Sequence, residues 1–213
     1  MDRSKIAIII PTFNEEFTIE KVVKSSSFFG VPIVVDDASN DRTVEKVKSL
    51  KAILISHKKN LGYDKTLNTG FKYASAQGYK YLITLDADNQ HDINSIPEFI
   101  KYLDLGYDLV GGVRGKRNRI AEKIFCLFTK LLWGLSDPLC GLKAYNFKLY
   151  LDFGYFDSYQ SIGTELLINA RRAGKKIKQI DVKIFSRSDK PRFGNNIYAN
   201  YKIFRALILT IYN

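Results

Sequence analysis

The chain has 213 residues, of which 46% are hydrophobic and 26% charged, a composition typical of a globular domain large enough to bury a full core. Its two cysteines, Cys126 and Cys140, form neither a disulfide framework nor a metal motif, and we expect both to be reduced. The net charge of +11 predicts a polyanionic partner, such as nucleic acid, an anionic membrane surface or a phosphorylated substrate. Simple solubility is the alternative explanation of this charge.

The hydrophobic pattern contains no membrane-spanning segment. No window reaches the roughly eighteen apolar residues that a spanning helix needs. The apolar run Ile6–Ile10 ends at Pro11 and is too short for a signal peptide. We therefore expect a cytoplasmic protein without a membrane span of its own.

Short apolar runs alternate with amphipathic segments in the first half of the chain. We expect strands at residues 6–10, 32–35, 52–56 and 81–85, and helices at residues 18–27, 44–50 and 64–77. This alternation predicts an α/β fold of βαβ units, with a mostly parallel central sheet flanked by helices. Because such crossovers are right-handed, the polar clusters Thr12–Glu16, Asp36–Thr43 and Asp86–His91 are expected at one edge, past the carboxyl ends of the strands.

The second half continues with strands at residues 107–113 and 177–185, and with a turn at residues 136–145 that runs into another strand. Helices are expected at residues 93–103, 120–135, 162–173 and 197–212. The basic loop 114–119 precedes the 120–135 helix, which has an apolar face opposite its lysines, as in segments that lie at membrane head groups. A solvated loop before an ordinary packed helix is the alternative. The chain has no recognised nucleic-acid motif, so we do not expect nucleic acid as the partner.

Two carboxylates and an amide follow the strand at residues 81–85. Side chains alternate along a strand, so Asp86, Asp88 and Gln90 can point the same way if the extended backbone continues. Their oxygens suit a hard divalent cation, Mg²⁺ or Mn²⁺. His91, inside the same motif, could hydrogen-bond a metal ligand or a phosphate, whereas His57 is expected at the surface. The alternative is a solvated turn, in which Asp and Asn are common.

A second acidic pair, Asp36-Asp37, also follows a strand end. A carboxylate at this place can accept hydrogen bonds from a nucleobase or a ribose, and capping of the following helix is the alternative. The sequence contains neither the glycine-rich dinucleotide fingerprint nor a P-loop. If phosphates bind here, a metal at Asp86 and Asp88 must neutralise them.

Four motifs in one order resemble a known family. The motifs are Ile8–Glu16, Val34–Thr43, Asn60–Gly62 and Leu85–His91. Together they are similar to family 2 glycosyltransferases with the A-type nucleotide-diphospho-sugar fold. Two further segments, Ser136–Tyr145 and Glu165–Gly174, resemble the dolichol-phosphate mannose synthase branch, so the resemblance covers residues 5–190.

The resemblance implies a single Rossmann-like nucleotide-diphospho-sugar transferase domain over residues 1–213. Residues 1–113 would form the nucleotide-sugar and metal half, and residues 114–213 the acceptor half. The implied activity is a metal-dependent, inverting transfer of a hexose from a GDP-mannose-type or UDP-glucose-type donor to a polyprenyl or dolichyl phosphate. Such an enzyme would lie peripherally at the anionic cytoplasmic face of a membrane. A partner protein could anchor it there.

The same resemblance assigns roles to individual residues. The residues implied for the nucleotide-sugar are Pro11, Glu15, Asp37 and Asp86. The residues implied for the metal are Asp86, Asp88 and Gln90, and those for the acceptor phosphate are Arg114, Arg117 and Arg119. The residues implied as catalytic, around the donor sugar and diphosphate, are Asp88, Asp137, Glu165 and Arg187.

Three features depart from the family pattern. The basic loop is shorter and less glycine-rich, Asp64-Lys65 replaces small residues after the Asn60–Gly62 turn, and the segment Gly194–Ile197 lacks the lysine of the family signature.

The nature of the acceptor separates the alternatives. An anionic acceptor needs no strong general base. Transfer to a sugar or protein hydroxyl, the first alternative, would need a carboxylate base such as Asp137 or Glu165. A non-catalytic nucleotide-sugar-binding subunit is the second alternative.

Overall fold

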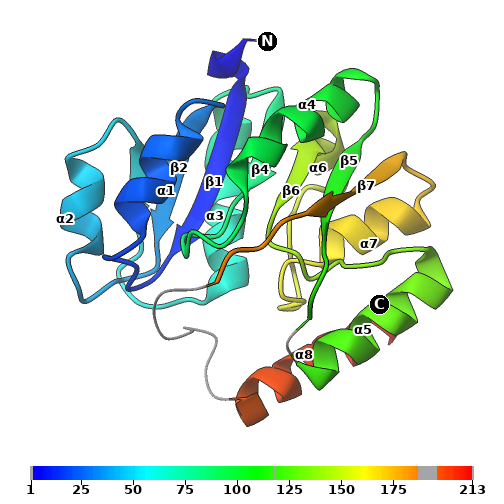
Figure 1. Ribbon diagram of the computed structural model, residues 1–213. Coiled ribbons are helices and arrows are strands. Elements are labelled where there is room, and N and C mark those ends of the chain that lie inside the picture. Colours follow the sequence, from blue (N-terminus) through cyan, green and yellow to red (C-terminus); the bar gives the residue numbers. More distant parts are fainter. Residues whose placement is uncertain (1, 118, 187–195, 213) are drawn as a thin grey trace.

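One sheet takes strands from both halves of the chain (Figure 1). The computed structural model describes residues 2–117, 119–186 and 196–212. Within them, seven strands pair in the order β3-β2-β1-β4-β6-β5-β7. The strands are β1 (Ile6–Thr12), β2 (Val31–Asp36), β3 (Ile53–Ser56), β4 (Tyr81–Thr84), β5 (Leu109–Arg114), β6 (Lys143–Asn146) and β7 (Ile177–Val182). The helices are α1 (Ile19–Ser26), α2 (Thr43–Lys48), α3 (Tyr63–Ala76), α4 (Ile96–Asp104), α5 (Ile120–Trp133), α6 (Phe147–Phe153), α7 (Glu165–Arg172) and α8 (Asn196–Tyr212).

The predicted α/β architecture with a mostly parallel sheet is confirmed. Strands β1 to β4 pair in parallel, as do β5 and β7, and helices cover both faces of the sheet (Figure 1). The exception is β6, which runs antiparallel to both β4 and β5. The first residue of β6, Lys143, therefore pairs with the last residue of β4, Thr84. This direction brings the turn before β6 to the carboxyl edge of β4, where the predicted metal motif begins.

Burial on both faces explains why the strands read as continuous apolar runs. Side chains alternate along β1 between two apolar clusters. Ala7 and Ile9 belong to the cluster that includes residues of α3, α5, α6, α7 and α8, whereas Ile6, Ile8 and Ile10 belong to the cluster of α1, α2 and α4. The first cluster continues into the loop before α7, since Phe71 of α3 packs against Phe156 with ring centroids 4.5 Å apart.

Two helices differ from the sequence-based expectation. Helix α6 is not predicted, although Asn146 caps its first turn by accepting a hydrogen bond from the Lys148 backbone N–H, and Gly154 ends it at a φ of 76°. Helix α7 begins at Glu165 instead of residue 162, because Ile162 and Gly163 adopt φ values of 61° and 67°, in the left-handed region.

No helix in the described ranges is both long enough and apolar enough to cross a bilayer.

Candidate active site

Asp86 lies directly past the carboxyl end of β4, as the sequence predicts. The Tyr63 hydroxyl donates to its Oδ1 at 3.1 Å, and His91 Nε2 lies 3.1 Å from its Oδ2. Burial alone would raise the pKa of Asp86, but these interactions with His91 and Tyr63 hold it below its ordinary value. His91 therefore contacts Asp86, the predicted metal ligand, and these interactions favour the ionised carboxylate and hold it in place.

The turn before β6 closes over the same carboxylate. A Cβ atom placed on Gly141 would lie 1.9 Å from Asp86 Oδ2, closer than any two such atoms can approach. Position 141 therefore has room for the Asp86 carboxylate only because glycine has no side chain. The hydroxyl of Thr84 donates to the Gly141 carbonyl at 2.7 Å and holds the turn in place.

Asp88 and Gln90 lie in a tight turn that is attached to the segment after β7. Asn89 adopts a φ of 58°, and the Gln90 backbone N–H donates to Asp88 Oδ1 at 3.1 Å. The Gln90 side-chain amide donates to the Phe185 carbonyl at 3.1 Å, while the Phe185 N–H donates to the Gln90 carbonyl at 2.8 Å. Because the amide nitrogen is engaged in this way, its oxygen is the atom left to act as a ligand.

The donor set of this motif fits a hard divalent cation, since Asp86, Asp88 and Gln90 all offer oxygen. Among the residues that the structure describes, no group of three or more His, Cys, Asp and Glu side chains is arranged to hold a metal ion by itself. Two carboxylates and one amide oxygen leave coordination positions for other oxygens. This is the pattern of a site that Mg²⁺ shares with the phosphates of a substrate.

Of the residues predicted for the nucleoside, Pro11 lies near the end of β1, and Glu15 and Asp37 follow the paired strands β1 and β2. The Asp37 carboxylate is buried and holds the Asn60–Gly62 turn, accepting hydrogen bonds from the Leu61 N–H at 2.8 Å and the Gly62 N–H at 2.7 Å. Glu15 is also buried.

The expected surface position of His57 is wrong. Its side chain is only 10% exposed and lies between Asp37 Oδ1, 2.8 Å from Nδ1, and the Thr69 hydroxyl, 2.9 Å from Nε2. The two partners lie 20 and 12 residues away in the sequence, so no local pattern could have shown these contacts.

Two of the predicted acceptor arginines, Arg114 and Arg117, contact the turn before β6. Arg114 forms a two-pronged ion pair with Asp137, with Nε 2.8 Å from Oδ2 and Nη2 3.0 Å from Oδ1. The Asp137 side chain has no exposed surface. Burial by itself favours the neutral form of both side chains. The ion pair outweighs this effect, so the pKa of Arg114 is raised and that of Asp137 is lowered. Arg117 donates to the Ser136 carbonyl at 2.9 Å, and Arg119 pairs with Glu122 at 3.2 Å.

Glu165, predicted near the donor sugar, is buried at the start of α7. Its two carboxylate oxygens accept hydrogen bonds from Ser158, one from the backbone N–H at 2.5 Å and one from the hydroxyl at 2.7 Å. Both Asp137 and Glu165 are therefore engaged by neighbouring groups of the protein. The remaining predicted catalytic residue, Arg187, lies outside the described residues.

Three residues near Asp86 are not among the predicted site residues: Tyr63, Gly141 and Lys143. Tyr63 directly follows the Asn60–Gly62 motif, and Gly141 precedes β6. Lys143 is a charged residue between apolar neighbours at the start of a buried strand, and this pattern is the signal that could have drawn attention to it.

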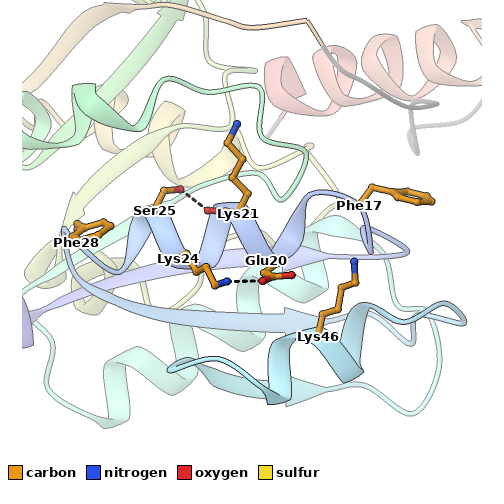
Figure 2. Close-up of a pocket in the computed structure, with 7 residues that line it drawn as sticks. All are labelled: Phe17, Glu20, Lys21, Lys24, Ser25, Phe28 and Lys46. Carbon is orange, nitrogen blue, oxygen red and sulfur yellow. Dashed lines mark hydrogen bonds and ion pairs between the residues drawn. The ribbon is translucent and has the colours of Figure 1, made fainter.

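One hollow on the described surface lies away from these residues. It has a volume of about 420 Å³ and is lined by side chains on and around α1 and α2, where Lys24 pairs with Glu20 at 2.5 Å (Figure 2). The lining residues are Phe17, Glu20, Lys21, Lys24, Ser25, Phe28 and Lys46, a set that contains no residue of the predicted site. Its open, charged surface gives no reason to move the candidate site away from Asp86.

Comparison with known proteins gives the family. The domain described as "Glycosyl transferase family 2" matches residues 7–123. The chain is 32% identical, over 68% of its length, to the undecaprenyl-phosphate 4-deoxy-4-formamido-L-arabinose transferase of Pectobacterium atrosepticum, and it spans about half the length of that relative. It is 27% identical, over 96% of its length and 95% of the relative's, to the UDP-N-acetylglucosamine–dolichyl-phosphate N-acetylglucosaminyltransferase of Methanococcus voltae.

The fold has a counterpart among solved structures. The glucosyl-3-phosphoglycerate synthase of Mycobacterium tuberculosis, in complex with Mn²⁺ and UDP-glucose, superimposes with a TM-score of 0.77 at 22% identity, over 98% of this chain and 79% of the other. Together with the matched domain, these findings show that the chain belongs to glycosyl transferase family 2 and is a glycosyltransferase with the A-type fold, with polyprenyl-phosphate sugar transferases among its relatives.

Proposed function

We propose that this protein transfers a sugar from a nucleotide-diphospho-sugar to a polyprenyl phosphate, with inversion at the anomeric carbon. One observation favours this acceptor over a hydroxyl. The two carboxylates that could serve as a general base, Asp137 and Glu165, are held by Arg114 and Ser158 respectively. A phosphate acceptor is already anionic and needs no such base, whereas a hydroxyl acceptor does. The two relatives described above are named for transfer to a polyprenyl phosphate, which supports the same class of acceptor.

For the donor, we propose a uridine nucleotide sugar ahead of GDP-mannose. The Methanococcus voltae relative is named for UDP-N-acetylglucosamine, and the Mycobacterium tuberculosis structure contains UDP-glucose. A dolichyl-phosphate mannosyltransferase remains the alternative that the same site would support.

In this proposal, Asp86, Asp88 and Gln90 would hold Mg²⁺ or Mn²⁺, which would neutralise charge on the leaving diphosphate. Asp86 is oriented for this role by Tyr63 and His91, so little reorganisation is needed when ligand binds.

The acceptor phosphate would bind at the basic loop. Arg117 is suited to this role, because its buried Nε–H finds no hydrogen-bond partner among the described residues. Arg114 would act mainly by holding the Asp137 turn, to which it is already tied. Arg187 would lie near the donor sugar and diphosphate, as the family resemblance implies.

The lipid acceptor would be reached at a membrane surface. Helices α5 and α8 pack side by side (Figure 1). Both leave large apolar side chains exposed. The exposed residues on these helices include Ile120, Leu127, Phe128, Leu131, Leu132, Ile197, Tyr201 and Ile208. Lys123 and Lys130 are exposed on α5, and the basic loop precedes it, so this face combines apolar contacts with positive charge, as peripheral binding to anionic lipid requires.

The test is a reconstituted transfer reaction. Purified protein with Mn²⁺ is mixed with UDP-N-acetylglucosamine, UDP-glucose or GDP-mannose and with liposomes that carry undecaprenyl or dolichyl phosphate, and lipid-linked sugar is extracted and quantified. We expect metal-dependent product with one of these donors, and none with Asp88→Ala. Donor binding without transfer to any lipid or hydroxyl acceptor would instead support a nucleotide-sugar-binding subunit.

A further inference from the structure

Lys143 is a buried cation at the centre of the site. It is the first residue of β6 and lies between Thr84 of β4 and Gly111 of β5 in the sheet. The residue is only 3% exposed. A lysine at such a position is unusual, because a buried ammonium normally has a carboxylate partner.

The ammonium of Lys143 has no dedicated partner in the described part of the chain. It donates one hydrogen bond, to the Gly163 carbonyl at 3.2 Å, and forms no ion pair there. Asp86 and Asp137 are close enough to attract it electrostatically. Neither is free to pair with it, since Asp86 is held by Tyr63 and His91 and Asp137 by Arg114. An ammonium has three N–H donors, and the described residues accept a hydrogen bond from only one of them.

The surroundings place this cation next to the predicted diphosphate site. The Gly163 loop that it contacts lies against the ring of Tyr63, with an ideal Cβ on Gly163 3.4 Å from a ring carbon. The Tyr63 hydroxyl in turn donates to Asp86. The Lys143 ammonium is therefore close both to this loop and to Asp86 of the metal motif.

Burial lowers the pKa of Lys143, and nearby Cys140, Asp86 and Asp137 only partly offset this effect. Replacement of a buried, incompletely paired charge by an apolar side chain of similar size is often neutral or stabilising. The stability of the fold alone therefore does not explain a lysine at position 143. A ligand that supplies the missing anion would account for a charge at this position.

We propose that Lys143 binds a phosphoryl oxygen of a substrate in the active site, an inference that rests on the proposed transfer to a polyprenyl phosphate. The oxygen belongs either to the diphosphate of the donor or to the phosphate of the acceptor. The donor diphosphate and the acceptor phosphate both offer anionic oxygens, and the ammonium would donate the same charge-assisted hydrogen bond to either.

The test separates these two sources. Binding is measured by calorimetry with UDP and GDP in the presence of Mn²⁺, and separately with farnesyl phosphate, a soluble prenyl phosphate. Lys143→Met removes the charge and keeps the length of the side chain, and Lys143→Gln is the second variant in case the first misfolds. Lys72→Met, on the exposed surface of α3, removes one positive charge at a distance from the site and is the matched control.

We expect Lys143→Met to weaken binding of one phosphate ligand by about tenfold to a hundredfold, with Lys72→Met unchanged. Weaker nucleotide binding identifies the donor diphosphate as the partner, and weaker farnesyl phosphate binding identifies the acceptor. The melting temperature of the ligand-free variant should equal or exceed that of the original chain.

A different pattern would overturn the assignment. Unchanged affinity for all three ligands in both Lys143 variants, with or without a lower melting temperature, would give Lys143 a purely structural role. If the unsubstituted protein bound neither nucleotide nor farnesyl phosphate, the proposed function would fail and this inference with it. Normal binding by the unsubstituted protein and by the variants alike would reject only the role of Lys143.

Discussion

Arg114 and Asp137 join the end of β5 to the turn that leads into β6. The guanidinium contacts both carboxylate oxygens, and the Arg114 backbone N–H donates a third hydrogen bond to Oδ2 at 3.0 Å. The same turn carries Gly141 over the Asp86 carboxylate. The ion pair therefore positions the metal motif indirectly, even though its two members were predicted separately, one for the donor sugar and one for the acceptor phosphate.

Asp137→Asn should destabilise the fold, because it leaves the Arg114 guanidinium largely buried without its counter-charge. We expect the free energy of unfolding to fall by about 3 kcal/mol, measured by urea denaturation. Asp152→Asn, which breaks the surface pair with Lys175, is the control and should change it by less than about 1 kcal/mol. Equal effects of the two substitutions would show that the buried pair does not stabilise the turn.

Gly141→Ala should displace the Asp86 carboxylate, because the new methyl group would overlap Oδ2. We expect Mn²⁺-dependent nucleotide binding to weaken by at least about tenfold while the far-ultraviolet circular dichroism spectrum is retained. Gly115→Ala is the matched control, since a Cβ there meets no atom within 4 Å and its backbone does not require glycine. Full nucleotide binding by Gly141→Ala would mean that Asp86 is not needed at its present position.

Tyr63→Phe removes one hydrogen bond from Asp86 and leaves the aromatic ring against Gly163. We expect Mn²⁺ affinity in the presence of nucleotide to fall by about tenfold, the usual effect of losing a group that orients a metal ligand. Titration of Mn²⁺ against nucleotide-saturated protein measures this. Tyr102→Phe, in which the hydroxyl is removed at a distance from Asp86, should leave the affinity unchanged.

Stability should depend on pH through Asp64. Burial, and after it the carboxylate of Asp157, raises the pKa of Asp64 from 3.8 to about 7, against the lowering effects of the Gly163 N–H and Lys202. Between these values the folded chain holds a proton that the unfolded chain has released. The free energy of unfolding therefore falls as the pH rises through this interval.

Asp64→Asn should remove this dependence. We expect the loss of stability between about pH 5 and about pH 8 to shrink by about 2 kcal/mol, measured by urea denaturation at both values. Asp181→Asn, at an exposed position on β7, is the control. An unchanged slope in Asp64→Asn would show that another group titrates in this range.

Leu131→Glu should weaken binding to anionic liposomes, because Leu131 is 75% exposed and is one of the exposed apolar side chains of α5 and α8. We expect at least a several-fold decrease in the bound fraction in a flotation assay, with nucleotide binding retained. Leu105→Glu introduces the same charge at another residue that is 64% exposed, directly after α4. Equal losses in both variants would point to net charge as the cause, and no loss in either would reject this face as the membrane contact.

The sequence by itself determined the alternation of strands and helices in the first half and the place of Asp86, Asp88 and Gln90 past β4. These features follow from local patterns, since an apolar run fixes a buried strand and a polar cluster marks its end. The edge at which the motifs meet follows from the handedness of the crossovers. The resemblance of four ordered motifs then indicated the family.

Only the tertiary structure decided the direction of β6 and the partners of the charged side chains. The four-residue strand β6 carries no local signal for its direction. That direction depends on its place in the sheet between β4 and β5. Asp137 meets Arg114 across 23 residues, and Asp37 meets His57 across 20. A charged residue in a sequence shows which chemistry is available, but burial and distance determine whether its charge is used by the fold or left for a ligand, as for Lys143.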